Sequence, residues 1–227
     1  MKPSLSVVLS VNGGYVDTAG FLALQGLFTS HVTGNFVTLG AALVLGTSGV
    51  LAKLMALPMF CLVVFGARWL SLELPARTFS PLRALLGLKV ALLSVGAALA
   101  VRLGPFHSGD GWQALVTGMT LVSAMAIQNA LHRMHMASSA PTTIMTGNTT
   151  QVMIDLVDSL RRLSPEMRAT LRSRLHRMST GVAAFASGCA AAALLYALRG
   201  NWCFIVPPLV GLYALWLPQA PPSAAGA

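Results

Sequence analysis

Several long stretches of this sequence contain no charged side chain. Three of them run from Gln113 to Leu131, from Met178 to Leu198 and from Cys203 to Leu217. A helix needs about 20 apolar residues, within a range of about 17–25, to cross the hydrocarbon core of a bilayer. Over the whole chain only 9% of the residues are charged, whereas soluble domains carry about 25%. The sequence therefore predicts an all-α, polytopic transmembrane bundle whose surroundings are the lipid bilayer.

Other apolar segments carry isolated charges. They run from Leu5 to Phe28, from Leu54 to Leu72 and from Leu82 to Leu103. The first is interpreted as a retained helix rather than a signal peptide, because Asp17 interrupts its apolar run. A shorter charge-free segment, Phe36 to Ala52, could be half-spanning or tilted, so we expect six to eight membrane segments.

A polar tripeptide occurs twice between apolar segments, as Thr33-Gly34-Asn35 and as Thr146-Gly147-Asn148. The duplication predicts two internal repeats, residues 1–105 and 106–217, followed by a Pro- and Ala-rich tail, 218–227, that is expected to be disordered. Matching polar breaks in two halves of a membrane protein are typical of a transporter with its binding site between the repeats.

A basic segment, residues 161–177, holds six of the fifteen Lys and Arg residues. Its apolar residues recur every three or four positions, and Ser164-Pro165 suits a helix N-cap followed by the first helical residue. Both an amphipathic helix at the membrane surface and a solvated loop fit this pattern, and the positive-inside rule places either in the cytoplasm. We expect Asp155 to pair with Arg161 or Arg162.

Asp17 is the only charge in the first apolar segment. Placing a charge at the bilayer centre costs at least about 2.5–3.5 kcal/mol. Proton or cation coupling is one interpretation of Asp17, and a structural ion pair with Arg133 is the other. His31 has no counterpart in the second motif, where the position is Ile144; a proton carrier and a packing histidine both remain open for it.

The repeated tripeptides are candidate ligand-lining breaks. Glycine frees the backbone, while Thr and Asn are expected to cap the helix that follows. A partly uncapped N-terminus would present N–H groups to a polar ligand, whereas tight packing through small residues is the alternative. The predicted substrate-binding or coupling residues are Asp17, His31, Thr33, Gly34, Asn35, Gln128, Asn129, Arg133, Thr146, Gly147, Asn148 and Gln151.

Other classes of site are not indicated. The three cysteines form no C-x-x-C pair, and no phosphate loop, nucleotide fingerprint or metal cluster occurs, so no cofactor and no metal are expected. The basic segment lacks the aromatic interleaving of a nucleic-acid surface. An intramembrane serine protease is a remote alternative, because Ser48 and His31 lie too close in sequence for two catalytic helices. We expect no enzyme.

Four motifs carry a resemblance to a known family. They are Gly14-x-x-Asp17-Thr-Ala19, Phe28-x-x-His31-x-Thr33-Gly34-Asn35, Gln128-Asn129-Ala130 and Pro141-Thr-Thr-x-Met-Thr-Gly-Asn148-x-Thr-Gln151. In these motifs the chain resembles the YoaK-like membrane proteins, a family described as domain of unknown function 1275. The resemblance covers about Asn12 to Leu212 and implies a polytopic helical protein of the bacterial inner membrane that is often labelled a small-molecule transporter.

These observations favour a secondary transporter or facilitator of a small polar solute, with a proton or cation as coupling ion. The site is expected where the two Thr-Gly-Asn motifs meet. A passive channel and a non-transporting membrane module that binds a lipid or a partner helix are the alternatives, and a homo-oligomer stays open.

Overall fold

The protein is all-α in the part of the chain that the computed structural model describes, residues 3–73, 80–161 and 164–217. Arg162 and the tail expected to be disordered lie outside these residues. The elements are α1 (Leu5–Ala23), α2 (Gly34–Leu45), α3 (Val50–Glu73), α4 (Pro81–Leu103), α5 (Trp112–His135), α6 (Met145–Ser159), α7 (Pro165–Arg199), the 3-10 helix η1 (Gly200–Ile205) and α8 (Val206–Trp216).

Four of the described helical stretches are long and apolar enough to cross a membrane. They are α3, α4, α5 and the joined stretch of α7, η1 and α8. With 12 residues, α2 is too short to cross by itself. The prediction of an all-α integral membrane protein is therefore confirmed at the level of fold class.

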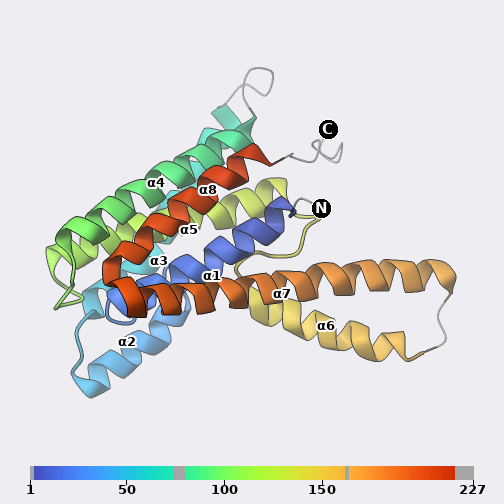
Figure 1. Ribbon diagram of the computed structural model, residues 1–227, viewed down its shortest axis with the longest axis horizontal. Helices are drawn as coiled ribbons and strands as arrows, with labels where there is room; N and C mark the ends of the chain where they lie inside the picture. Colours follow the sequence, from blue (N-terminus) through green and yellow to red (C-terminus); the bar gives the residue numbers. More distant parts are fainter. Residues whose placement is uncertain (1–2, 74–79, 162–163, 218–227) are drawn as a thin grey trace.

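The helices form one elongated bundle with a hairpin extending from it. In Figure 1, α4, α8 and α1 lie roughly along one direction, while α7 runs obliquely across α1 and continues beyond the bundle together with α6. The short α2 lies at the other end of the picture, beside the start of α3. Residues 165–177 of the basic segment thus form the first part of a single 35-residue helix.

Two apolar cores define the two ends of the bundle. One core joins Leu9 near the start of α1 to Leu131 near the end of α5 and Ala214 near the end of α8. The other joins Ala23, at the end of α1, to Ala114, near the start of α5. It follows that α1 and α5 pass through the bundle in opposite directions.

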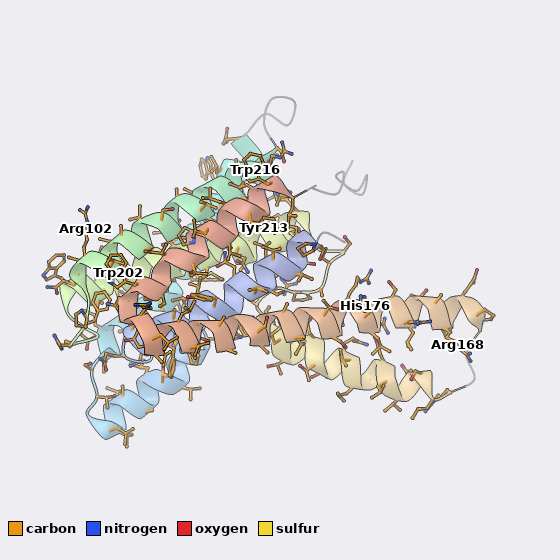
Figure 2. All side chains as sticks on the ribbon, in the orientation of Figure 1. Arg102, Arg168, His176, Trp202, Tyr213 and Trp216 are labelled. Atoms are coloured by element: carbon orange, nitrogen blue, oxygen red, sulfur yellow. The ribbon has the colours of Figure 1, made fainter. Side chains whose placement is uncertain are left out.

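Tryptophans mark both ends. Trp69 and Trp216 lie at the ends of α3 and α8, whereas Trp112 and Trp202 lie at the start of α5 and in η1. Each is at least 60% exposed. Figure 2 shows Trp202 and Trp216 at opposite ends of the stretch formed by η1 and α8. Exposed tryptophans in two bands are typical of the two interfaces of a membrane.

Glycines allow α1 and α7 to cross in backbone contact. A Cβ atom added at Gly188 would lie 2.1 Å from the carbonyl oxygen of Val11, and one added at Gly14 would lie 2.2 Å from that of Phe185. Small residues at a helix crossing let the backbones approach closely, which is the main source of packing energy between helices in lipid. This crossing places α7 beside Asp17.

An acidic side chain from the second half of the chain caps α3. The carboxylate of Asp110 accepts hydrogen bonds from the backbone N–H groups of Gly49, Val50, Leu51 and Ala52, at 2.8–3.2 Å. These are the donors that a helix N-terminus leaves without partners, and the negative charge also suits the positive end of the helix dipole. Asp110 therefore fixes the start of α3 to the loop that precedes α5.

The α1–α7 crossing yields a stability prediction. We expect Gly188→Ala to lower the unfolding free energy by about 1–3 kcal/mol or more, because the added methyl meets backbone atoms, which cannot move aside as a side chain can. Thermal unfolding of the purified protein in detergent measures this effect. Gly66→Ala is the matched control, since a Cβ atom there meets nothing within 4 Å. Equal melting temperatures for the two variants would contradict the close crossing.

Candidate functional site

The carboxylate of Asp17 binds the connection that follows α1. Its Oδ1 accepts hydrogen bonds from the backbone N–H groups of Thr29 at 2.7 Å and Ser30 at 2.8 Å, and from the Thr29 hydroxyl at 3.2 Å. Its Oδ2 lies 2.5 Å from Nδ1 of His31. A buried carboxylate needs such partners, because lipid supplies none. The structural ion pair of Asp17 with Arg133, one of the two interpretations from the sequence, does not form. Arg133 is exposed, and Asp17 pairs with His31 instead.

An open groove lies beside this pair. It has a volume of about 470 Å³ and is lined by the pair, by Phe21 and Phe28, and by Phe185 of α7, among others. The side chain of His31 is 39% exposed, whereas that of Asp17 is 5% exposed. His31 is therefore the more exposed member of the pair.

Asn35 of the first motif holds the same connection together. Its Oδ1 accepts a hydrogen bond from the N–H of Phe28, and its Nδ2 donates one to the carbonyl of Phe28, both at 2.8 Å. Thr33 occupies the N-cap position of α2 but makes no capping hydrogen bond with its side chain. Gly34 allows close approach of the Phe28 ring, which would lie 3.2 Å from an added Cβ atom. Asn35 therefore holds the loop between α1 and α2 in place. The expectation that Thr33 caps α2 with its side chain is wrong.

Asn148 of the second motif makes the corresponding contact. Its Nδ2 donates a hydrogen bond at 2.9 Å to the carbonyl of Pro141, seven residues upstream, just as Asn35 reaches seven residues back. The N-cap position of α6 is Ile144, so Thr146 is not a cap either. Thr146 and Gly147 are exposed, whereas Asn148 is buried. Both asparagines thus have the same local role.

Polar residues of α5 hold the second connection. Asn129 accepts a hydrogen bond from the Thr143 hydroxyl at 2.7 Å. Gln128 donates from Nε2 to the Thr142 hydroxyl at 3.1 Å and to the carbonyl of Leu9 at 2.9 Å. These two residues tie the loop before α6 to α5 and α1, in the way that Asp17 ties the loop before α2 to α1.

The connections that lead into the two motifs contact α1 at different heights. Thr29 packs against Gly20, and Thr142 packs against Gly13, positions about 10 Å apart along a helix. The groove beside Asp17 is lined by residues of α1, α7 and the connection from α1 to α2, and by none of residues 141–148. The structure therefore brings Asp17, His31 and Asn35 together, and separately Gln128, Asn129 and Asn148.

Gln151 takes part in a third network, in the hairpin of α6 and α7. Its Nε2 donates a hydrogen bond at 2.7 Å to Asp155, and Asp155 forms an ion pair with Arg174 of α7. The expected pairing of Asp155 with Arg161 is wrong, because the continuous helix α7 brings Arg174 alongside α6 instead. Gln151 thereby supports the hairpin and is remote from the groove beside Asp17.

Sequence reasoning missed two buried polar residues. Asn12 of α1 and Lys89 of α4 are both fully buried, and each has a side-chain atom without a hydrogen-bond partner within the described residues. The signal was present for Lys89, because it is a charge in the interior of an apolar segment. Within the described residues, no group of three or more His, Cys, Asp or Glu side chains could hold a metal ion.

A family model for proteins of unknown function, DUF1275, matches residues 5–217. The chain belongs to the DUF1275 family. This confirms the family resemblance expected from the paired motifs. The comparison with curated proteins and the comparison with solved structures give no match. Membership of DUF1275 therefore assigns no activity, and the four long apolar helices are what indicate a membrane protein.

The hairpin contacts predict a pH-dependent local stability. Arg174 and Gln151 hold the pKa of Asp155 below its ordinary value of 3.8. Because the folded state lowers this pKa, the ion pair stabilises the hairpin fully above about pH 4, and the stabilisation is lost as the pH falls below that value. We expect Asp155→Asn to reduce protection of α6 amides from hydrogen exchange about 10-fold at neutral pH.

Asp158→Asn is the control for that measurement, because it removes a nearby carboxylate that makes no direct ion pair with any described residue. Unchanged protection of α6 in Asp155→Asn at neutral pH would mean that the ion pair does not hold the hairpin together.

Proposed function

We propose that this DUF1275 protein is a secondary transporter or facilitator of a small polar solute in the bacterial inner membrane. The observation that carries the proposal is the correspondence between its two halves, which cross the bundle in opposite directions. The Asp17–His31 pair is the proposed coupling group, with a proton as the coupling ion.

The correspondence follows the order of the elements. In the first half a long helix, a polar connection, a short helix and two long helices follow one another, as α1 to α4. In the second half α5, α6, α7 and the stretch of η1 and α8 repeat that order. In each half, the first long helix packs on the helix that follows the short helix of the other half: α1 packs on α7, and α5 packs on α3. Each short helix packs on the long helix that follows it.

The direction of each helix supports an inverted repeat. Because α1 and α5 pass in opposite directions, an axis lying in the membrane plane would relate the two halves. Inverted repeats of this kind occur in many secondary transporters, with the substrate site near the middle of the bilayer where the repeats meet.

Charge distribution supports an orientation. Arg68, Arg83 and Arg133 lie at one end of the bundle, here called the basic end, near the ends of α3 and α5 and the start of α4. Because α7 runs in the same direction as α1, its arginine-rich start lies on the side of the basic end. The positive-inside rule places this end in the cytoplasm.

The Asp17–His31 pair has the features of a proton-coupling site. One member is buried and the other is half-exposed to an open groove, so the pair links the interior of the bundle to the outside. Ionisable residues inside membrane proteins commonly mark proton relays, and histidine titrates within the physiological range.

One observation favours a non-transporting membrane module or a passive channel instead. Asn35 and Asn148 are occupied by hydrogen bonds to their own connections, as expected for structural clamps. For the remote alternative, a serine protease, Ser48 would need a histidine partner. Its hydroxyl accepts a hydrogen bond from the N–H of Gly109, and no hydrogen bond joins it to a histidine within the described residues.

Reconstitution into proteoliposomes tests the proposal. Uptake of a panel of small polar solutes is followed together with the internal pH, reported by a trapped dye. We expect wild type to take up at least one solute with accompanying proton movement, and Asp17→Asn and His31→Gln to lose the proton movement. Asp158→Asn should behave as wild type, because its carboxylate lies in the hairpin, away from the groove.

Thermal unfolding of each variant establishes that it is folded before uptake is compared. If wild type transports no solute of the panel, the transport proposal fails. If folded Asp17→Asn and His31→Gln both move protons at the wild-type rate, the coupling role of the pair is wrong.

A further inference from the structure

Three buried side chains in the middle of the bundle each leave one polar atom without a partner. They are Nζ of Lys89, Oδ1 of Asn12 and Oε1 of Gln128, and no hydrogen-bond partner for any of them is found within the described residues. All three residues are 0% exposed. An unsatisfied buried polar atom destabilises the folded state, and more so if it is charged. Three such atoms in one small protein therefore require an explanation.

Lys89 and Gln128 lie on one seam between α4 and α5. The two helices are antiparallel and pack closely at Gly96, where an added Cβ atom would lie 2.7 Å from the side chain of Leu121. Lys89 precedes Gly96 by seven residues, and Gln128 follows Leu121 by seven. Seven residues are two helical turns, about 10.5 Å, so both residues lie on the packed faces and at the same height.

Asn12 reaches the same region from α1. The hydrogen bond from Gln128 to the carbonyl of Leu9 places Gln128 against α1, one turn from Asn12. An added Cβ atom at Gly211 of α8 would lie 3.8 Å from Nδ2 of Asn12 and 2.8 Å from the side chain of Val90, the residue next to Lys89. Four helices, α1, α4, α5 and α8, therefore meet in the region of Asn12, Lys89 and Gln128.

The orientations of both amides are fixed. Asn12 donates from Nδ2 to the carbonyl of Pro207 at 3.1 Å, and Gln128 donates from Nε2 to the carbonyl of Leu9 at 2.9 Å. Carbonyl oxygens only accept hydrogen bonds, so neither amide can be turned around to hide its oxygen. The region thus presents two fixed acceptors and one amine.

The chain itself supplies no carboxylate to Lys89. Asp17 is bound by His31, Asp110 caps α3 and Asp155 pairs with Arg174. The other described carboxylates lie at helix ends: Glu73 at the end of α3, Asp158 near the end of α6 and Glu166 at the start of α7. A ligand that satisfies all three atoms brings a negative group to Lys89 and N–H or O–H donors to Asn12 and Gln128. Small amino acids and hydroxy acids carry both.

We propose that Lys89, Asn12 and Gln128 form an occluded binding site for a small amino- or hydroxycarboxylate. The site deepens the proposed function and rests on it, because it lies where helices of the two halves meet and would be the substrate site of the transporter. The carboxylate of the ligand binds Lys89, and its amino or hydroxyl group donates to Asn12 and Gln128.

Ligand-induced stabilisation tests the site without transport. The full-length protein in mild detergent is heated in the presence of L-serine, L-lactate, acetate, inorganic phosphate or chloride, and unfolding is followed by tryptophan fluorescence. A ligand that binds only the folded state raises the melting temperature with concentration. We expect L-serine or L-lactate to raise it by about 5 °C at saturation, and acetate and chloride to raise it much less.

Lys89→Met tests the role of the amine. It keeps the length of the side chain and removes an unpartnered polar group, so the free protein should fold and be at least as stable as wild type. Its affinity for the stabilising acid should fall at least ~10-fold. Lys53→Met is the matched control: Lys53 is also buried, but it donates to the carbonyl of Ser48 at the other end of the bundle.

The outcomes separate the two proposals. Equal stabilisation of wild type and Lys89→Met, no stabilisation by either acid, or stabilisation by phosphate or chloride alone would each overturn the site. Binding that depends on Lys89 supports the site, even if proteoliposomes show no uptake, a result that would reject transport alone. Uptake that is unaffected by Lys89→Met would support transport and reject this site.

Discussion

A bundle surrounded by lipid has no water with which to satisfy its buried polar groups, so each group must be bound by the chain or by a ligand. This constraint explains much of the structure. Asp17 and Asn35 bind the connection between α1 and α2, and Asn129 and Asn148 bind the connection between α5 and α6. Loops that would otherwise carry free N–H and carbonyl groups are thereby tied to helices. The exceptions, at Asn12, Lys89 and Gln128, are informative because every other buried side-chain nitrogen and oxygen of the described residues has a hydrogen-bond partner.

The features that the sequence predicted correctly are local ones. Charge-free runs indicated the membrane helices, and Ser164-Pro165 indicated the start of α7, where Ser164 accepts a hydrogen bond from the N–H of Met167. Features that depend on how helices pack were not predictable. Asp110 caps a helix that begins 60 residues before it. Asp155 pairs with Arg174 rather than with Arg161, because Arg174 belongs to the long helix α7, which packs along α6.

In the candidate site, too, local features were predictable from the sequence and features that depend on helix packing were not. The sequence singled out Asp17 and His31 separately, but nothing in their spacing indicates a direct contact, which depends on the turn after α1. It indicated that the two Thr-Gly-Asn motifs are equivalent, and both asparagines do reach back seven residues. It did not indicate that the connections before the two motifs contact α1 at different heights. Lys89 was visible as a charge in an apolar segment, but its lack of a partner depends on all the helices around it.

The proposed account joins these observations in one arrangement: two halves that cross the membrane in opposite directions and enclose unpartnered polar groups where they meet. Labelling with a membrane-impermeant maleimide tests the direction in which α5 crosses, on which this arrangement depends. It uses single cysteines introduced by Ser108→Cys before α5 and Ser138→Cys after it, in a chain whose three native cysteines are replaced. Both serines are exposed. The account predicts that intact cells are labelled at position 108, and that position 138 is labelled only after the membrane is opened. Labelling of both positions from the same side would contradict it.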